Sequence, residues 1–360
     1  MCETANCTDA DEPIVYQNYS ERIIYATVTG LISISGAFGN TLVILAVFIS
    51  KKLRNKTNTF VVNLAIADLI SCLNLPWTAL ALLCEDEWPL PDWICMWEGM
   101  ILMVSTGCSL YTLGGIALSR ACLITLPNHR YHEILTPKTL FGLIMIFWLI
   151  PVTTSIVPYI VSDSFFGFNE RYSMCIWNTT HPFSPYYNLI LAITFYPVPL
   201  FIIFFSYFRI WRHVRTNSRR MARVTTRIVT VSGQLAGLAR KSTFSKRQMS
   251  VTKNLFIIIV VFLILISPYS IQLVIPGGER LVPAFGMIFL FNSCVNPFIY
   301  GTRHPDFKVA FRSILRCPVR SNQLMDSTAS AGLRVQPLIR RPAQRDTEFI
   351  APNSTSSSES

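Results

Sequence analysis

The chain has 360 residues, of which 51% are hydrophobic and only 14% are charged, and its formal net charge is +11. Soluble proteins carry roughly a quarter charged residues, so most of this chain does not face water. The basic excess lies in loops that border apolar segments, which argues against a nucleic-acid partner.

Seven apolar stretches of membrane-spanning length follow one another along the chain. Each is long enough for a transmembrane helix, whereas a membrane strand needs only about ten residues of alternating polarity. The predicted spans are residues 23–50, 59–84, 93–124, 139–161, 185–208, 254–276 and 281–302. A soluble protein of this size cannot bury seven such helices in one core. We therefore predict an all-α membrane protein with a bundle of seven transmembrane helices.

The segments on either side of the bundle complete the predicted organisation. Residues 1–22 form a polar, acidic tail without the apolar core of a signal peptide, so the first helix is expected to direct insertion. After the transmembrane domain (23–302), residues 303–317 place apolar side chains at helical spacing among basic ones. This pattern predicts a short amphipathic helix on the inner membrane surface. Residues 318–360 are rich in Ser, Thr, Pro and Arg, which predicts a disordered cytoplasmic tail.

The distribution of Lys and Arg predicts the orientation. Basic residues follow the first span at 51–56, and the region 209–253 between the fifth and sixth spans is the most basic of the chain. The N-terminal tail and residues 85–92 are acidic. Positively charged loops stay in the cytoplasm, so we expect the N-terminus outside, the C-terminus inside, and residence in the plasma membrane.

This orientation assigns candidate modification sites. Asn6, Asn18 and Asn178 are glycosylation acceptors on the outer side, and Cys317 at the end of the amphipathic helix is a candidate for palmitoylation. Further cysteines lie on or near the outer side, where disulfides persist, and the sequence alone leaves their pairing open. They are Cys2, Cys7, Cys84, Cys95 and Cys175.

The middle of the predicted bundle contains one acidic residue, Asp68, with polar residues at a similar depth. These are Asn40, Ser109, Asn292 and Asn296. A charge in the hydrocarbon costs roughly 2.5–3.5 kcal/mol on insertion scales, so the carboxylate needs a reason to be there. A site for a sodium ion, water or a proton is one interpretation, and a purely structural hydrogen-bonded network is the other. Prolines 158, 199, 268 and 297 interrupt four helices, which is typical of a bundle that bends.

The order and spacing of these residues resemble a rhodopsin-like (class A) G-protein-coupled receptor across about 23–317. The motifs that carry the resemblance are GN at 39–40, NLAIAD at 63–68, Trp88 before Cys95, Arg120 25 residues after that cysteine, Trp148 with Pro158, Cys175, Pro199 with Tyr207, Phe262 with Pro268, and NPFIY at 296–300. Within the class, GIALSR and FNSCVN most resemble the melatonin-receptor-like branch, which includes orphan receptors.

The resemblance implies roles for these residues. Cys95 and Cys175 would form a disulfide, and the polar residues around Asp68 would form a sodium and water pocket. Phe262 and Pro268, with Pro199, would belong to a core that repacks on activation. Tyr207 and Tyr300 would stabilise an open cytoplasmic face, where Arg120 meets the G protein.

The sequence departs from the family pattern around Arg120. The usual acid–Arg–Tyr triplet is Ser119-Arg120-Ala121, and the position of a second restraining acid is Gln248. Our hypothesis is raised basal signalling, because no carboxylate holds the arginine at rest. The alternative is that Ser119 or Gln248 restrains the guanidinium by a hydrogen bond. In the sixth span, Ile266 replaces the usual tryptophan before Ser267-Pro268, so a tryptophan switch is not expected.

The expected ligand pocket is mainly apolar. The position of the amine-binding aspartate is Leu102, and 281–302 has no lysine for a retinal Schiff base. The predicted lining is Leu102, Met103, Thr106, Phe195, Tyr269, Gln272 and Phe289. Such a lining favours a neutral or lipophilic small molecule, although a peptide that engages the acidic outer surface remains an alternative.

We therefore expect a receptor, not an enzyme, that couples an extracellular ligand to heterotrimeric G proteins. Its basic inner loop would meet G protein and anionic membrane lipids, and Ser354–Ser358 would recruit arrestin after phosphorylation by receptor kinases. No cofactor is expected beyond an allosteric sodium ion. Because the Ser119-Arg120-Ala121 triplet departs from the family pattern, a signalling-poor decoy or scaffold is the alternative function. A transporter is disfavoured because few charges lie in the spans.

Overall fold

The computed structural model describes residues 15–84, 88–161, 165–228, 256–257, 259–272 and 278–316, with backbone only at 161, 217–228 and 279. In these ranges six helical segments are long and apolar enough to cross a membrane. They are Tyr19–Ile49, Lys56–Leu83, Asp92–Thr125, Pro137–Ile160, Ser184–Thr216 and Val282–Arg303, and Ile259–Gln272 is a shorter apolar helix. These helices confirm the predicted all-α fold. The ends of the predicted span 254–276 lie outside the described residues.

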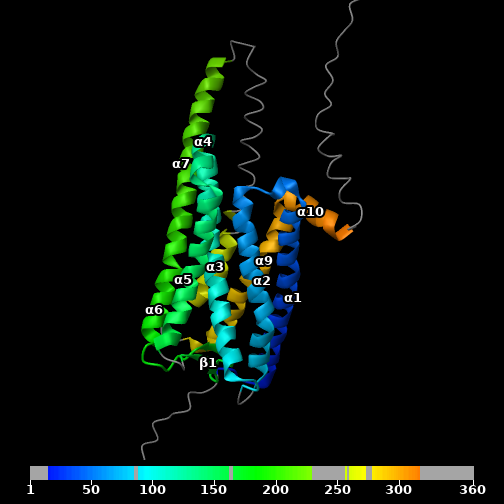
Figure 1. Cartoon of the computed structure of the whole chain (residues 1–360), viewed down its shortest axis with the longest axis vertical. Coiled ribbons are helices and arrows are strands. Elements are labelled where there is room, and N and C mark those ends of the chain that lie inside the picture. The colour runs from blue at the N-terminus through cyan, green and yellow to red at the C-terminus, as the bar shows by residue number, and fades with distance from the viewer. Residues whose placement is uncertain are drawn as a thin grey trace, which may run out of the picture. The chain divides into compact units, whose positions relative to one another are not determined.

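Helix α3 (Asp92–Thr125) lies at the centre of the bundle (Figure 1). It packs against α2 (Lys56–Leu83), α5 (Pro137–Val161) and α7 (Pro197–Ile228), and most of its side chains are buried. Helix α1 (Tyr19–Ile49) packs against α2 and against α9 (Val282–Arg303). A central helix with contacts on several sides is well placed to connect the two ends of the bundle.

The fifth predicted span is interrupted near its middle. Helix α6 (Ser184–Phe195) ends before Tyr196, and α7 begins at Pro197. Proline lacks a backbone N–H and disfavours the helical conformation of the residue before it, and Pro199 follows two residues later. The break turns Tyr196 toward the sixth helix, where its hydroxyl lies 2.7 Å from the hydroxyl of Ser267.

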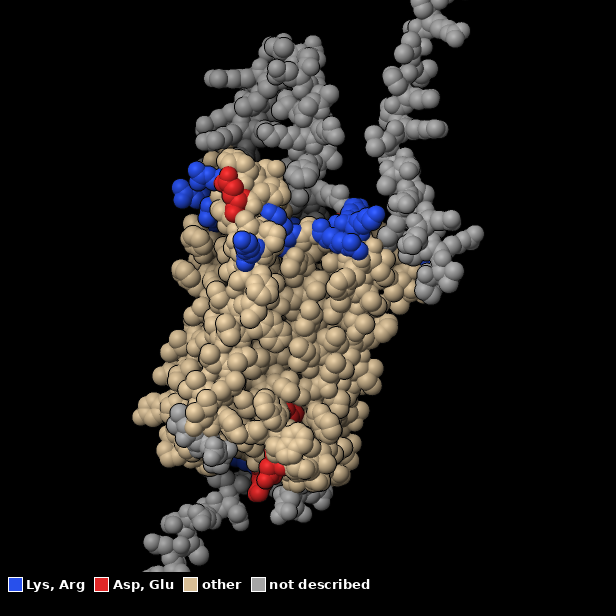
Figure 2. Space-filling view, in the orientation of Figure 1, with Lys and Arg blue, Asp and Glu red and all other residues tan. Residues whose placement is uncertain are grey.

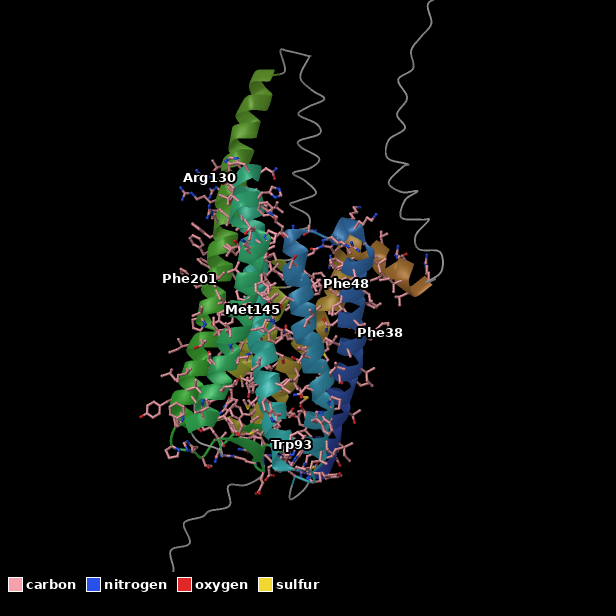
Figure 3. All side chains as sticks on the ribbon, in the orientation of Figure 1. Phe38, Phe48, Trp93, Arg130, Met145 and Phe201 are labelled. Atoms are coloured by element: carbon pink, nitrogen blue, oxygen red, sulfur yellow. A yellow bond between two sulfur atoms is a disulfide. The ribbon has the colours of Figure 1, made fainter. Side chains whose placement is uncertain are left out.

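The outer surface of the bundle is apolar. Phe38, Phe48 and Phe201 are at least 60% exposed, and their side chains point away from the bundle (Figure 3). Lys and Arg gather at the end that carries α4 (Asn128–Ile134) and the short helix η1 (Lys51–Leu53), above a broad, mostly uncharged belt (Figure 2). We refer to this end as the α4 end. A contiguous apolar surface of this extent marks a contact with lipid or with another apolar surface.

A β-hairpin covers the opposite end, which we refer to as the hairpin end. Strands β1 (Phe166–Asn169) and β2 (Met174–Trp177) pair antiparallel, with Phe168 opposite Cys175. Cys175 forms a disulfide with Cys95 of α3, as the family resemblance predicts. The chain before α1 is tied to the same hairpin, since the Tyr16 hydroxyl donates a hydrogen bond of 2.8 Å to the Tyr172 carbonyl.

Helix α10 (Pro305–Arg316) follows α9 and confirms the predicted helix in this segment. Its apolar face buries Phe307 and Ala310, and the Phe307 ring stacks on Tyr300 of α9. The Lys52 ammonium lies 2.8 Å from the Asp306 carboxylate and links η1 to α10. These contacts hold α10 against the α4 end of the bundle.

Gly99 sets how closely the hairpin approaches α3. A Cβ atom at Gly99 would lie 2.6 Å from the Cys175 carbonyl oxygen, which is backbone and cannot swing away. We predict that Gly99→Ala lowers the free energy of unfolding by about 1–3 kcal/mol, as other overpacking changes do. The measurement is the melting temperature of the purified protein.

Gly30→Ala is the matched control, because it is also helical and has no neighbouring atom within 4 Å of the added carbon. It should be neutral or stabilising by up to about 1 kcal/mol. Equal melting temperatures for Gly99→Ala and the unsubstituted protein would contradict the close approach.

Candidate functional site

Asp68 joins three helices in the middle of the bundle. Its side chain is fully buried on α2. One carboxylate oxygen accepts a hydrogen bond of 2.7 Å from Ser109 of α3, and the other accepts one of 2.8 Å from the Asn296 amide of α9. The structure thus brings together three of the predicted polar residues. Each contact offsets the cost of placing a carboxylate where no bulk water reaches it.

Asn40 and Asn292 lie in the same polar layer but do not bond Asp68. The Asn40 amide donates to the Gly36 carbonyl at 3.0 Å and to the Ser293 carbonyl at 2.8 Å, which ties α1 to α9. The side-chain amide oxygens of Asn40, Asn292 and Asn296 are buried and accept no hydrogen bond from the described residues.

These unpaired oxygens fit a small hard cation. Hard cations take carboxylate, carbonyl and hydroxyl oxygens as ligands, and Asp68 supplies one formal negative charge. The described residues contain no cluster of three or more His, Cys, Asp or Glu, so a transition-metal site does not arise among them. Within this part of the chain, the donor set is suited to a monovalent ion.

A second polar network connects α2, α3 and α5. The Asn63 side chain accepts a hydrogen bond of 3.0 Å from the Trp148 indole and donates one of 2.7 Å to the Thr112 hydroxyl. The sequence motifs include Asn63 and Trp148, but their spacing in the chain does not show that they meet. Only the packing of the three helices brings them into contact.

The hairpin end contains a pocket between α3, α6, α9 and the helix Ile259–Gln272. It holds about 950 Å³ of empty space, part of which is open to solvent. Six of the predicted lining residues are present, and they are Leu102, Met103, Thr106, Phe195, Tyr269 and Phe289. Gln272, the seventh, does not line this pocket among the described residues; it ends its helix, and its side chain lies beside Gly278.

The hairpin forms the part of the pocket that the sequence does not reveal. Phe166 of β1 and the strand Met174–Trp177 line the pocket over the helices. Ile266 lies in the lining, and the buried Phe262 lies one turn further into the bundle on the same helix. No charged side chain is part of the described lining, whose polar members include Thr78 and Ser270. The pocket is therefore suited to a mainly apolar molecule.

Arg120 lies at the other end of α3 and is buried. Its Nε atom has no hydrogen-bond partner among the described residues. The phenols of Tyr131, Tyr207 and Tyr300 lie within electrostatic range of the guanidinium. The hydroxyls of Tyr207 and Tyr300 are also buried without a partner in the described part of the chain. The two predicted activation tyrosines are thus close to Arg120, although neither bonds it.

Ser119 does not restrain Arg120. Its hydroxyl lies 2.9 Å from the Thr57 hydroxyl, so its hydrogen bond joins α3 to α2 instead. This finding corrects the alternative in which Ser119 bonds the guanidinium. Gln248, the other residue in that alternative, lies outside the described residues.

Several predicted sites lie at the surface or beyond the described residues. Asn18 caps α1 by accepting a hydrogen bond from the Glu21 amide, and Asn178 accepts one from the Thr180 hydroxyl. Pro268 lies inside the helix Ile259–Gln272. Asn6 and Cys317 are outside the described ranges, as are Cys2, Cys7 and Ser354–Ser358, while Cys84 is a half-buried free thiol.

Comparison with known proteins gives consistent matches over this fold. The sequence profile of the family "7 transmembrane receptor (rhodopsin family)" matches residues 39–300. The histamine H2 receptor of Canis lupus familiaris is 28% identical over 85% of this chain and 83% of its own. The melatonin receptor type 1A of Ovis aries is 27% identical over 77% and 73%. The allatostatin-A receptor of Bombyx mori is 26% identical over 80% and 78%.

A solved structure supports the fold. Squid rhodopsin superposes with a TM-score of 0.73 at 21% sequence identity, over 89% of this chain and 93% of the other. The three relatives are named for histamine, melatonin and allatostatin-A, and their identities to this chain are nearly equal. These values do not select one ligand class.

Binding of sodium by the oxygens around Asp68 can be tested by thermal unfolding. At a concentration ten times its Kd, a bound ion adds about 1.4 kcal/mol to stability. We expect the purified protein to melt at a higher temperature in sodium chloride than in choline chloride of equal ionic strength. Asp68→Asn should abolish the difference, whereas Glu170→Gln, which neutralises an exposed acid, should keep it. Equal melting in both salts would count against a sodium site.

Proposed function

Since the chain belongs to the rhodopsin family of seven-transmembrane receptors, a family of G-protein-coupled receptors, we propose that it converts binding of an extracellular small molecule into activation of heterotrimeric G proteins. It is a multi-pass membrane protein. The observation that carries the proposal is the course of α3. Leu102 and Thr106 line the pocket at one end of this helix, and the buried Arg120 lies at the other.

The proposed mechanism is a shift between two populations of the bundle. A ligand in the pocket contacts Ile266, behind which Phe262 is packed in the core. Repacking of these two side chains would favour an outward position of the sixth helix, in which Arg120 faces a cytoplasmic cavity. Tyr207 and Tyr300, which are already near the guanidinium, would stabilise that open state.

The proposed ligand is small and mainly lipophilic. Leu102 cannot pair an ammonium group at the level where it lines the pocket, and α9 supplies no lysine for a retinal Schiff base. Aromatic residues on several helices give the pocket an apolar wall, and they include Phe195, Tyr196 and Phe289.

The proposed orientation places the α4 end in the cytoplasm of a cell with the protein in its plasma membrane. The Lys and Arg side chains at that end support it (Figure 2). The glycosylation motif at Asn178, in the segment after β2, also supports it. In this orientation Asn6, Asn18 and Asn178 would carry glycans, and Cys317 would carry a palmitoyl group. Ser354–Ser358 would be the substrate of receptor kinases and recruit arrestin.

A signalling-poor decoy or scaffold is the second candidate function, and the altered Ser119-Arg120-Ala121 triplet favours it. A transporter is less well supported. The described spans place Asp68, Glu98 and Arg120 at separate levels, and these charges do not line a continuous path.

Arg120 tests the receptor function. We predict that Arg120→Ala lowers nucleotide exchange on G proteins by at least about tenfold at equal surface expression, which corresponds to about 1.4 kcal/mol. The measurement is guanine-nucleotide exchange in transfected membranes across a panel of G proteins, without ligand and with lipid, amine and peptide libraries. Arg280→Ala is the control, because this exposed arginine lies at the hairpin end. Identical exchange with and without Arg120 under every condition would favour the decoy.

Ser119 tests the hypothesis of raised basal signalling. We predict that Ser119→Asp lowers ligand-independent exchange two- to fivefold, about 0.4–1 kcal/mol, because the longer carboxylate would turn from Thr57 to the Arg120 guanidinium and stabilise the resting state. Ser119→Asn has similar size without the charge and should leave the basal signal near that of the unsubstituted receptor. An unchanged basal signal in Ser119→Asp at matched expression would contradict the hypothesis.

A further inference from the structure

Glu98 is a buried acid beside the ligand pocket that the activation mechanism does not use. It lies on α3 one turn from Leu102 toward the hairpin end, and its side chain is only 2% exposed. One carboxylate oxygen accepts a hydrogen bond of 2.5 Å from the Thr78 hydroxyl of α2. The other oxygen is buried and has no hydrogen-bond partner among the described residues.

Glu98 is one hydrogen bond away from the pocket. Thr78 and Gly99 line the pocket on either side of it, and the residue one turn below, Leu102, is also part of the lining. Residues four apart lie on the same face of a helix. The carboxylate is therefore behind the wall of the pocket where α2 and α3 meet.

No cation of the protein pairs this carboxylate in the described part of the chain. The outer segments contain three Lys or Arg residues, Arg22, Arg171 and Arg280, and the undescribed outer segments 1–14, 85–87, 162–164 and 273–277 contain none. Arg22 donates to the Leu82 carbonyl and lies over the Tyr16 ring. Arg171 lies over Tyr172 in the hairpin turn, and Arg280 is exposed.

A structural role alone does not require an acid at this position. The backbone carbonyl of Glu98 accepts a hydrogen bond of 2.9 Å from Asn74, so α2 is already held to α3 there. Glutamine could accept the Thr78 hydroxyl equally well. Burial of an ionised carboxylate costs several kcal/mol unless a cation pairs it, so the charged form of an acid at this position is favoured by a bound cation.

We propose that Glu98, together with Thr78, recognises a positively charged group of the ligand. The ligand is then a lipophilic molecule that carries one protonated amine. The Thr78 hydroxyl donates a hydrogen bond to Glu98, so its oxygen can accept a hydrogen bond from an N–H of the ligand. The carboxylate supplies the compensating charge, while the apolar wall around Leu102, Ile266 and Phe289 holds the body of the molecule.

This inference rests on the proposed function only in taking the pocket as the ligand site. The inference places the charged contact at Glu98, one helical turn from Leu102 toward the hairpin end. At Leu102 itself no acid is present. A ligand with its amine at the level of Thr78 would extend toward Ile266 and reach the packed core. The lipophilic character of the proposed ligand is unchanged.

The effect of Glu98 on the electrostatic potential in the pocket can be measured without a known ligand. A cysteine is introduced by Leu102→Cys in a background of Cys2→Ser, Cys7→Ser and Cys84→Ser. The protein is then treated with two methanethiosulfonates, one with a quaternary ammonium and one with a sulfonate. The ratio of their reaction rates reports the local potential, because the reactivity of the thiol itself cancels. The same ratio is measured with Glu98→Gln added, and Glu170→Gln serves as the control.

We expect the cation-to-anion rate ratio to fall about tenfold with Glu98→Gln and to stay unchanged with Glu170→Gln. An equal ratio with and without the Glu98 carboxylate would overturn the proposal. Failure of both reagents to react would also overturn it, because a charged molecule could then not enter.

A second measurement covers the case in which Glu98→Gln does not reach the cell surface. Leu191→Cys places the thiol on α6, at another wall of the same pocket. With Glu98 intact, the ratio should be several-fold higher at Leu102→Cys than at Leu191→Cys, and equal ratios would overturn the proposal. Neither readout involves a G protein, so failure here is distinguishable from failure of the receptor function.

Discussion

The hydrogen bonds at Asp68 are the contacts on which the arrangement of the bundle depends. In a membrane no hydrophobic force drives one helix against another, and polar groups in the hydrocarbon must find partners within the protein. Asp68 meets this constraint by accepting from Ser109 and Asn296, which fixes α2, α3 and α9 at one level. The hydrogen bond between Trp148 and Asn63 joins α5 to α2, and the one from Asn40 to the Ser293 carbonyl joins α1 to α9. Most of the bundle is therefore positioned by a few polar side chains.

Helix α3 passes from the pocket through the polar layer at Asp68 to the α4 end. It carries pocket residues at the hairpin end, Ser109 in the middle and Arg120 at the α4 end. A change in side-chain packing around the pocket can thus alter the polar layer and the surroundings of the guanidinium through one rigid element. The Ser119–Thr57 contact holds the foot of α3 to α2, so the Ser119 hydroxyl does not bond the Arg120 guanidinium. The arginine is buried near the phenols of Tyr131, Tyr207 and Tyr300, and the proposed opening of the α4 end would expose it.

The sequence predicts the helices, because they depend on composition along the chain. It does not predict the contacts between segments that are far apart in the chain. Apolar length alone locates the helices, and the family resemblance identifies the Cys95–Cys175 disulfide and the partners of Asp68. The hairpin over the pocket and the Thr78–Glu98 contact are set by packing between distant segments. No local pattern encodes them.

The claim that the pocket and Arg120 are coupled is tested most directly by filling the pocket covalently. The receptor with Leu102→Cys is placed in nanodiscs and labelled with a bulky neutral maleimide, and nucleotide exchange on G proteins is measured before and after labelling. Coupling predicts that exchange rises or falls with labelling when Arg120 is present, and that the effect disappears with Arg120→Ala. Unchanged exchange after complete labelling would contradict it.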